Sequence, residues 1–246
     1  MALSPIILIP ARMGASRLPG KPLADIAGTP MIVRVLRQAQ AAGVGPVAVA
    51  AADPEIVAMV EAAGGRAVLT DPDLPSGSDR IMAALGRLDP RGRHDAVINL
   101  QGDMPLVEPA IVAACAEVLA ATPCDIATVV APEASPADRD NPDVVKAVLA
   151  IEAHGRSGRA LYFTRSRLYG EGPVWRHVGI YGYRPRALAR FTAAPPSSLE
   201  RREKLEQLRA LELGLRIDAA VTASAPISVD TPADLAAARA AAEGGS

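Results

Sequence analysis

Short apolar runs alternate with amphipathic segments along the first half of the chain. Ile6–Ile9 is rich in branched side chains and stopped by Pro10, a pattern that predicts a buried strand. Alternation of such strands with helices predicts a parallel sheet covered by helices on both faces, with its ligand crevice beyond the carboxyl ends of the strands. Further strands are expected at 47–51, 67–69, 95–100, 126–130 and 144–150, and helices at 29–42, 56–63, 76–88 and 109–121.

The second half of the chain has fewer segments in which apolar residues recur with a clear helical or strand period. Val178–Tyr183 alternates as a strand does, and the stretch from Ser198 to Leu213 places leucines on one stripe, which predicts a helix capped by Ser198. The charges at 200–204 are typical of a solvated helix face. A last helix is expected from Pro232, with Asp230 or Thr231 as its cap.

The loop after the first strand, Ala11–Pro22, carries unusual charge. It contains three cations, Arg12, Arg17 and Lys21, together with two glycines and two prolines but no carboxylate. Glycines let a backbone approach a polyphosphate closely, and Arg and Lys supply the opposing charge. The sequence therefore favours a phosphate-binding loop, with an ordinary solvated connection as the alternative.

This loop lacks the two commonest nucleotide-binding patterns. Five residues, not four, separate Gly14 from Gly20, and Lys21 is followed by Pro22 where a P-loop has Ser or Thr. No G-x-G-x-x-G motif is present either. Kinases, P-loop hydrolases and dehydrogenases are therefore disfavoured.

Composition narrows the class further. A chain of 246 residues suffices for one large α/β domain, and its net charge of −1 argues against a nucleic-acid partner held by bulk electrostatics. Cys115 and Cys124 have no CxxC spacing, so we expect buried, reduced thiols. The first apolar run is too short to cross a membrane and lacks the basic flank of a signal peptide, so we expect a cytoplasmic protein with no membrane partner.

Several polar residues have both a functional and a structural interpretation. Asp103 follows the strand at 95–100, where an α/β nucleotide enzyme would hold Mg²⁺, although turn chemistry explains an Asp there equally well. Helix capping alone accounts for Ser76, and a structural hydrogen bond is the commoner role for a residue like His177. Arg80, in the first turn of a helix, is expected to need an anionic partner or an exposed position.

Motifs along nearly the whole chain resemble those of one enzyme family. They are 9–12, 16–23, 76–80, 99–103, 160–165, 177–184, 205–209 and 229–232, in the family's order. In these motifs the chain resembles the sugar-activating cytidylyltransferases, most closely the branch that acts on 3-deoxy-D-manno-octulosonate. The resemblance implies Mg²⁺-dependent transfer of CMP from CTP to the anomeric hydroxyl of that sugar acid, with release of pyrophosphate, for lipopolysaccharide biosynthesis.

The resemblance also implies an architecture. It is a Rossmann-like nucleotide-diphospho-sugar transferase fold of the α/β class, with a largely parallel twisted sheet flanked by helices. We expect a single nucleotidyltransferase domain over 1–246, in which 161–213 form a small sugar-binding and dimerisation lobe of a homodimer.

The same resemblance assigns the site. Asp103 and Asp230 are the expected magnesium ligands, and with Arg12, Arg17 and Lys21 they form the expected catalytic set. Nucleotide contacts are expected from Pro10, Ala11, Arg12, Ser16, Arg17, Lys21, Ser76, Gly77, Arg80 and Gln101. Sugar contacts are expected from Gln101, Arg165, His177, Tyr181, Glu206 and Gln207.

The chain departs from the family at a few positions. Met104 stands where many relatives have Glu, which puts in question a charge near the metal but not the expected ligand Asp103, and Arg201 replaces a common histidine. Two other functions stay open. In the first, the chain is a cytidylyltransferase whose acceptor is another acidic sugar, such as the 8-amino octulosonate or a sialic acid. In the second, the chain is a non-catalytic protein that binds nucleotide sugars.

Overall fold

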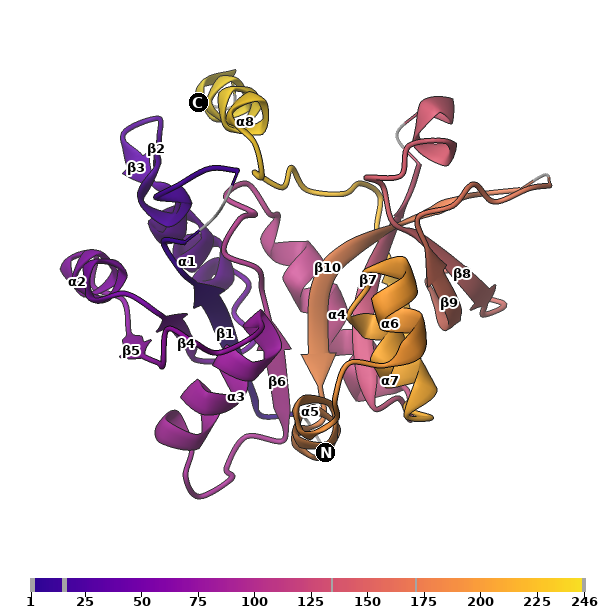
Figure 1. The fold of residues 1–246 in the computed structure, drawn as a ribbon, viewed down its shortest axis with the longest axis horizontal. Coiled ribbons are helices and arrows are strands. Elements are labelled where there is room, and N and C mark those ends of the chain that lie inside the picture. The colour runs from indigo at the N-terminus through magenta and orange to yellow at the C-terminus, as the bar shows by residue number, and fades with distance from the viewer. Residues whose placement is uncertain (1–2, 15–16, 134, 171, 245–246) are drawn as a thin grey trace. The chain divides into compact units, whose positions relative to one another are not determined.

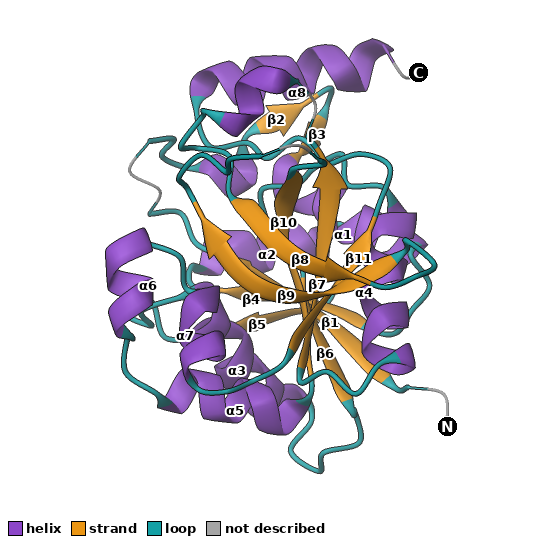
Figure 2. Cartoon of the chain, turned by 90° about the vertical axis from the view of Figure 1, so that its right-hand side faces the viewer, coloured by secondary structure: helices purple, strands orange, loops and turns teal. Residues whose placement is uncertain are grey.

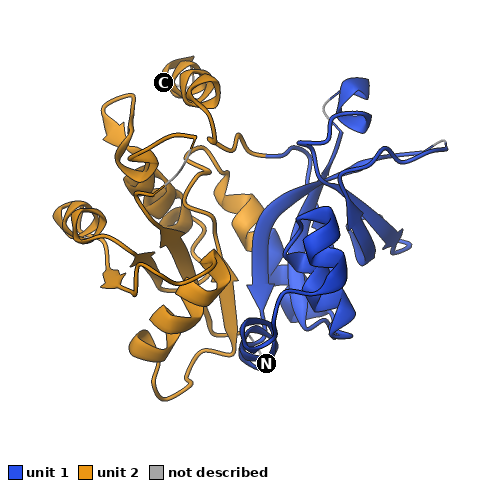
Figure 3. Cartoon of the chain, in the orientation of Figure 1, with its two compact units in different colours: residues 1–2, 114–225 blue, residues 3–113, 226–246 orange. Residues whose placement is uncertain are grey.

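The computed structural model describes residues 3–14, 17–133, 135–170 and 172–244. The chain divides into two compact units (Figure 3). One comprises residues 3–113 together with 226–246, and the other comprises residues 114–225. The predicted lobe at 161–213 falls within the second unit, and the expectation of one domain over the whole chain stays a prediction.

The first unit contains the parallel sheet that the sequence predicts. Its strand order is β5 (Ala67–Leu69), β4 (Val47–Ala51), β1 (Pro5–Ala11) and β6 (Ala96–Asn99), all parallel. The prediction that Pro10 stops β1 is wrong, since the strand runs on to Ala11. The backbone nitrogen of Pro10 faces β6, and the pairing of β1 with β6 has already ended at Leu8. No carbonyl of β6 therefore depends on the N–H group that proline lacks.

Helices cover both faces of this sheet. α1 (Met31–Ala41) and α2 (Pro54–Ala62) contact each other, and α3 (Gly77–Leu88) packs on β1 and β4. Because the connection from β5 to β6 runs back across the sheet, a right-handed crossover places α3 on the face opposite α1 and α2. The carboxyl ends of β1 and β6 therefore lie at the same edge of the sheet, with α1 and α2 on one face and α3 on the other.

The C-terminal helix α8 (Pro232–Gly244) belongs to this unit although it follows the second unit in sequence. It lies beside a small hairpin of β2 (Asp25–Ile26) and β3 (Thr29–Pro30), as Figures 1 and 2 both show. The sequence analysis missed this hairpin and the short 3-10 helix η1 (Lys21–Leu23) before it. Buried apolar side chains join the two segments: Ile26, Met31, Val229, Leu235 and Ala238.

The second unit has a mixed sheet, so the expectation of a largely parallel sheet holds only for the first. β7 (Ile126–Pro132) pairs parallel with β11 (Ile217–Val221) and antiparallel with β10 (Trp175–Tyr183). β9 (Ser157–Thr164) pairs antiparallel with β11 and with β8 (Lys146–Ile151), which also meets β10. Helix α4 (Pro109–Ala121) leads into the unit, which also holds η2 (Pro136–Arg139) and α5 (Pro185–Ala193).

The predicted helix at 198–213 is two helices, α6 (Ser198–Glu203) and α7 (Gln207–Glu212). Lys204 ends the first in the left-handed region, with φ of 55°. Ser197, not Ser198, is the cap, and it forms a capping box with Glu200. Glu200 also accepts hydrogen bonds from Arg209 at 2.6 and 2.8 Å, an ion pair that holds the two helices together across the break.

The expectation for the cysteines is met. Cys115 and Cys124 are free and buried, and burial raises the pKa of both thiols. Within the described part of the chain, every helix is too short or too polar to cross a lipid bilayer.

Candidate functional site

The basic loop after β1 folds back on itself. The N–H of Gly20 bonds to the carbonyl of Met13 at 3.2 Å, and Gly20 has a φ of 72°, which explains a glycine at the turn into η1. Asp53, at the end of β4, accepts a hydrogen bond from the N–H of Met13 at 2.8 Å. The sequence analysis assigned no role to Asp53, which ties this loop to the sheet.

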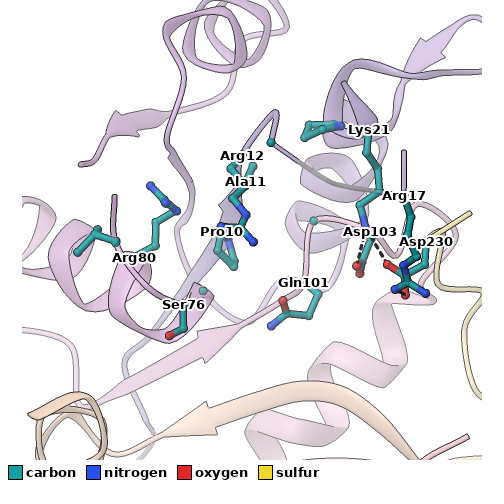
Figure 4. Close-up of a pocket in the computed structure, with 15 residues that line it drawn as sticks. Pro10, Ala11, Arg12, Arg17, Lys21, Ser76, Arg80, Gln101, Asp103 and Asp230 are labelled. Atoms are coloured by element: carbon teal, nitrogen blue, oxygen red, sulfur yellow. Dashed lines mark hydrogen bonds and ion pairs between the residues drawn. The ribbon is translucent and has the colours of Figure 1, made fainter. Parts of the chain in front are cut away.

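Lys21 joins two carboxylates that lie far apart in sequence. Its Nζ lies 3.0 Å from Oδ2 of Asp103 and 3.1 Å from Oδ1 of Asp230, residues 82 and 209 positions away. Arg17 Nη2 lies 3.3 Å from the other oxygen of Asp230. Figure 4 shows Lys21 extended toward this carboxylate pair, with Arg17 beside Asp230.

Backbone contacts fix both aspartates. Asp103 follows β6, and its carbonyl accepts a hydrogen bond from the N–H of Val229 at 2.8 Å. The Val229 side chain is fully buried in the cluster beneath α8, which orients Asp230 next to it. Asp234 accepts from the N–H groups of Asp230 and Thr231, and the Thr231 hydroxyl caps α8. Packing of the C-terminal helix therefore brings Asp230 to the end of β6.

The donor set suits a magnesium ion. Oδ1 of Asp103 is buried and has no hydrogen-bond partner among the described residues. Burial raises the pKa of Asp103, and the Lys21 ammonium opposes that shift. The described residues contain no cluster of three or more His, Cys, Asp or Glu side chains, so the protein would supply two carboxylates and leave the other positions to phosphate and water.

These groups line one cavity of about 460 Å³. Such a volume lies in the usual range for sites of small organic ligands. Its walls come from the basic loop, the start of α3, the segment after β6 and Asp230. They are Pro10, Ala11, Arg12, Gly14, Arg17, Lys21, Pro22, Leu74, Ser76, Gly77, Arg80, Gln101, Gly102, Asp103 and Asp230. All predicted nucleotide-binding residues are among them except Ser16, which lies outside the described residues.

Close approaches of glycine shape the cavity wall. A Cβ on Gly102 would lie 2.9 Å from the carbonyl oxygen of Pro10, so this position excludes a side chain. A Cβ on Gly77 would come within 3.3 Å of Pro10 Cγ and 3.8 Å of Gln101 Oε1. Gln101 is in turn oriented by a hydrogen bond from its Nε2 to Oδ1 of Asn99, at 3.2 Å.

Arg80 contradicts its expected environment. It is buried, and its guanidinium donates to the Thr70 hydroxyl at 2.6 Å and to the carbonyls of Asp71 and Pro72 at 2.9 and 3.3 Å. Neutral oxygens therefore take the place of the predicted anionic partner, and burial lowers the pKa of Arg80. Ser76 caps α3 as predicted, by accepting from the N–H of Asp79.

The basic side chains of the loop differ in their surroundings. Among the described residues Arg12 forms no ion pair and is exposed, whereas the side chain of Lys21 is only 15% exposed. Met104, which replaces the common Glu, is buried and adds no charge to the cavity.

The predicted sugar-binding residues, other than Gln101, lie in the second unit. The rings of His177 and Tyr181 are 5.5 Å apart, and burial together with the charges of Tyr183 and Glu206 raises the pKa of Tyr181. Glu206 and Gln207 begin α7, where Glu206 Oε1 lies 3.7 Å from Arg209 Nη2.

Arg165 is oriented by other groups. Its Nη1 donates to the carbonyl of Pro142 at 2.9 Å, and its own carbonyl accepts from Lys146 Nζ at 3.0 Å. Lys146 is fully buried, with a second bond to the carbonyl of Asn141. The sequence analysis missed this contact, because a lysine at the start of an apolar strand gives no sign of which carbonyls it will meet.

Comparison with known proteins identifies the family. A family model described as cytidylyltransferase matches residues 6–217. The chain is 60% identical over 237 residues to 3-deoxy-manno-octulosonate cytidylyltransferase of Methylobacterium nodulans, covering 96% of each chain. It is 57% identical over 242 residues to the enzyme of the same name from Parvibaculum lavamentivorans, covering 98% of this chain and 93% of that one.

A solved structure agrees in fold and sequence. CMP:2-keto-3-deoxy-manno-octonic acid synthetase complexed with CTP superposes with a TM-score of 0.89 at 37% identity, covering 99% of this chain and 100% of that one. The predicted α/β nucleotidyltransferase fold is confirmed, and its dimerisation lobe stays a prediction.

Proposed function

The chain belongs to the cytidylyltransferase family, and from that premise we propose that it transfers CMP from CTP to the anomeric hydroxyl of 3-deoxy-D-manno-octulosonate. Near-complete matches to relatives named for this activity support the choice of nucleotide and acceptor. The observation that carries the proposal is the convergence of Lys21, Asp103 and Asp230 in one cavity with Arg12 and Arg17.

The cationic loop is suited to the triphosphate. Arg12, Arg17 and Lys21 bring positive charge to one wall of the cavity, so we assign them to the β- and γ-phosphates and to the departing pyrophosphate. Gly77 keeps this part of the cavity wall free of a side chain, because a Cβ there would lie 3.3 Å from Pro10 Cγ. Arg80 contributes by holding the 70–72 segment in place, because its guanidinium is engaged with Thr70 and with backbone carbonyls.

Asp103 and Asp230 would hold the magnesium ion. When bound, this ion supplies positive charge that neutralises the α-phosphate and favours ionisation of the attacking hydroxyl. Lys21 has to exchange its carboxylate partners for phosphate oxygens, because its ammonium lies between the two aspartates. The buried, unpartnered Oδ1 of Asp103 supports this assignment.

The reaction is a direct transfer without a covalent enzyme intermediate. The anomeric oxygen forms a bond to the α-phosphorus, and the bond from that phosphorus to the bridging oxygen breaks. The electron pair leaves with pyrophosphate, and the hydroxyl proton passes to water. Positioning and charge neutralisation are the protein's main contributions to phosphoryl chemistry of this kind.

The acceptor site completes the proposal. We assign the sugar acid to a set of hydrogen-bonding groups and one cation in the second unit: Arg165, His177, Tyr181, Glu206 and Gln207. A cytoplasmic location is part of the proposal, since CTP is a cytoplasmic metabolite, and so is a product destined for lipopolysaccharide biosynthesis. The homodimer stays a prediction.

The test is pyrophosphate release measured with CTP and Mg²⁺ over a panel of acidic sugars, and repeated with ATP, GTP and UTP. Release that requires CTP and the octulosonate together is expected. Preference for the 8-amino octulosonate or a sialic acid would keep the reaction and overturn the acceptor. CTP binding without release for any acceptor would overturn the proposal in favour of a nucleotide-sugar binding protein.

A further inference from the structure

A buried hydroxyl in the second unit lies against the predicted sugar-binding histidine. Thr128, in the middle of β7, is fully buried. Its Oγ1 lies 2.9 Å from the carbonyl oxygen of Ile180, 3.4 Å from that of Val178 and 3.0 Å from Nε2 of His177. Three polar atoms of β10 therefore surround one hydroxyl.

An irregularity in β10 creates this arrangement. The register between β10 and β7 shifts between Val178 and Tyr181, as in a β-bulge. Two backbone carbonyls at this shift lie within hydrogen-bond distance of the Thr128 hydroxyl. A valine in place of Thr128 would have nearly the same shape but would leave those carbonyls without this donor.

Hydrogen-bond accounting then fixes the imidazole. A threonine hydroxyl has one proton to donate, and a carbonyl oxygen can only accept. We place that proton on the bulge, because two carbonyl oxygens of β10 face the hydroxyl there and Ile180 is the nearer of them at 2.9 Å. Toward His177 the hydroxyl oxygen must accept, so Nε2 of His177 carries the hydrogen.

The second ring nitrogen is consequently a free acceptor. The His177 ring packs edge-on against Phe163, with centroids 5.0 Å apart, and lies against Tyr181. Burial lowers the pKa of His177 to about 4, so the ring is neutral at pH 7. Among the described residues no side chain or backbone group hydrogen-bonds to Nδ1, which keeps its lone pair.

We propose that Thr128 is a positioning residue that locks His177 in the Nε2–H tautomer, so that Nδ1 accepts a hydrogen bond from a hydroxyl of the sugar acid. The inference rests on the proposed function for the identity of the ligand. In this arrangement Nδ1 of His177 faces a hydroxyl group of the sugar, which can donate. The sugar carboxylate is excluded as its partner, because a carboxylate oxygen and Nδ1 would both present lone pairs and neither could donate. The carboxylate falls to other residues of the proposed acceptor site, of which Arg165 carries a positive charge.

The first test needs no substrate. The chain has three histidines, so ¹⁵N NMR of protein labelled at histidine, with His94 and His154 assigned by substitution, resolves both nitrogens of His177. We expect a protonated Nε2 and an unprotonated Nδ1 in the wild type and in Thr128→Ser, and a changed tautomer population in Thr128→Val. A protonated Nδ1 in the wild type, or an unchanged tautomer in Thr128→Val, would overturn the proposal.

Kinetics test the consequence for recognition. Thr128→Val is expected to raise the KM for the octulosonate about tenfold, the worth of one hydrogen bond, while the KM for CTP stays unchanged. Thr128→Ser should restore most of the affinity. In a His177→Phe background the Thr128→Val change should cost no further affinity, since the group it positions is gone.

The outcomes separate this inference from the proposed function. If no acidic sugar supports turnover in the wild type, the proposed function fails while the NMR result still decides the tautomer. Equal losses of octulosonate affinity from Thr128→Val in the wild-type and His177→Phe backgrounds would show that Thr128 acts through the fold and not through His177.

Discussion

Replacing Lys21 by Met tests whether its ammonium and a magnesium ion share the same carboxylate pair. The substitution keeps an unbranched side chain of similar length and removes the charge that lies 3.0 Å from Asp103 and 3.1 Å from Asp230. Without that charge Asp230 keeps only its ion pair with Arg17 at 3.3 Å, and Asp103 loses the one cation that contacts it among the described residues. Asp103 also has a second oxygen that already lacks a partner among those residues.

The expected loss of stability follows from this geometry. Two unit charges 3.0 Å apart attract by about 5.5 kcal/mol at an effective dielectric constant of about 20. Dehydration of the ammonium offsets part of this attraction, and the side chains remain 15%, 23% and 44% exposed for Lys21, Asp103 and Asp230. We therefore expect a net loss of about 2 kcal/mol, or about 4–8 °C in Tm for a chain of this size.

Thermal unfolding with and without Mg²⁺ is the assay, with Lys204→Met as the matched control at an exposed lysine. In the absence of Mg²⁺ we expect Lys21→Met to unfold at a lower temperature than the control. Saturating Mg²⁺ should restore more than half of the difference, because the cation compensates the same two carboxylates. Turnover should nevertheless fall about 10²–10³-fold, since Lys21 is proposed to stabilise charge that develops in the transition state. An equal deficit in Tm with and without Mg²⁺ would refute the shared site.

Three further predictions address other parts of the molecule. Asp230→Asn should lower pyrophosphate release at least about a hundredfold but lower Tm by no more than about 4 °C, because partly exposed ion pairs contribute at most about 1 kcal/mol; normal release across a Mg²⁺ titration would contradict this role. Gly102→Ala should raise the KM for CTP and lower Tm, since its Cβ would lie 2.9 Å from the carbonyl of Pro10, and wild-type values of both would show that the backbone yields freely. The pKa of His177 is about 4 in the folded protein and 6.5 in the unfolded chain, so the folded protein holds this ring neutral at pH 7. Its contribution to the free energy of unfolding is therefore fully present above pH 6.5. That contribution, at most about 3 kcal/mol, is lost as the pH falls toward 4. His177→Phe should therefore have a flatter decline of unfolding free energy over that pH range than the wild type, as measured by denaturant titration.

The first unit could be predicted from the sequence because its elements are strongly periodic. The strand at Val47–Ala51 has the predicted bounds, and α3 ends at the predicted Leu88. The second unit was harder. The leucine stripe over 198–213 suggested one helix, and nothing local shows that Lys204 adopts a left-handed conformation, which depends on the Glu200–Arg209 pair across the break.

The site was predictable in its residue types but not in its connections. Asp230 has the sequence signature of a helix cap, and only family resemblance suggested otherwise. Its approach to Lys21 depends on α8 packing against the β2–β3 hairpin, a contact between segments about 200 residues apart that no local pattern encodes. Thr128 was missed for a related reason: a threonine within an apolar strand is unremarkable until the bulge in β10 brings Ile180 and His177 to it.

The measurement that tests the central claim most directly is a ³¹P NMR time course with CTP, Mg²⁺ and 3-deoxy-D-manno-octulosonate. Transfer of CMP predicts a new phosphodiester signal from the sugar nucleotide that grows in equal amount with pyrophosphate, and neither signal without the sugar. Conversion of CTP to CDP and phosphate, or to free CMP without the phosphodiester, would contradict the claim.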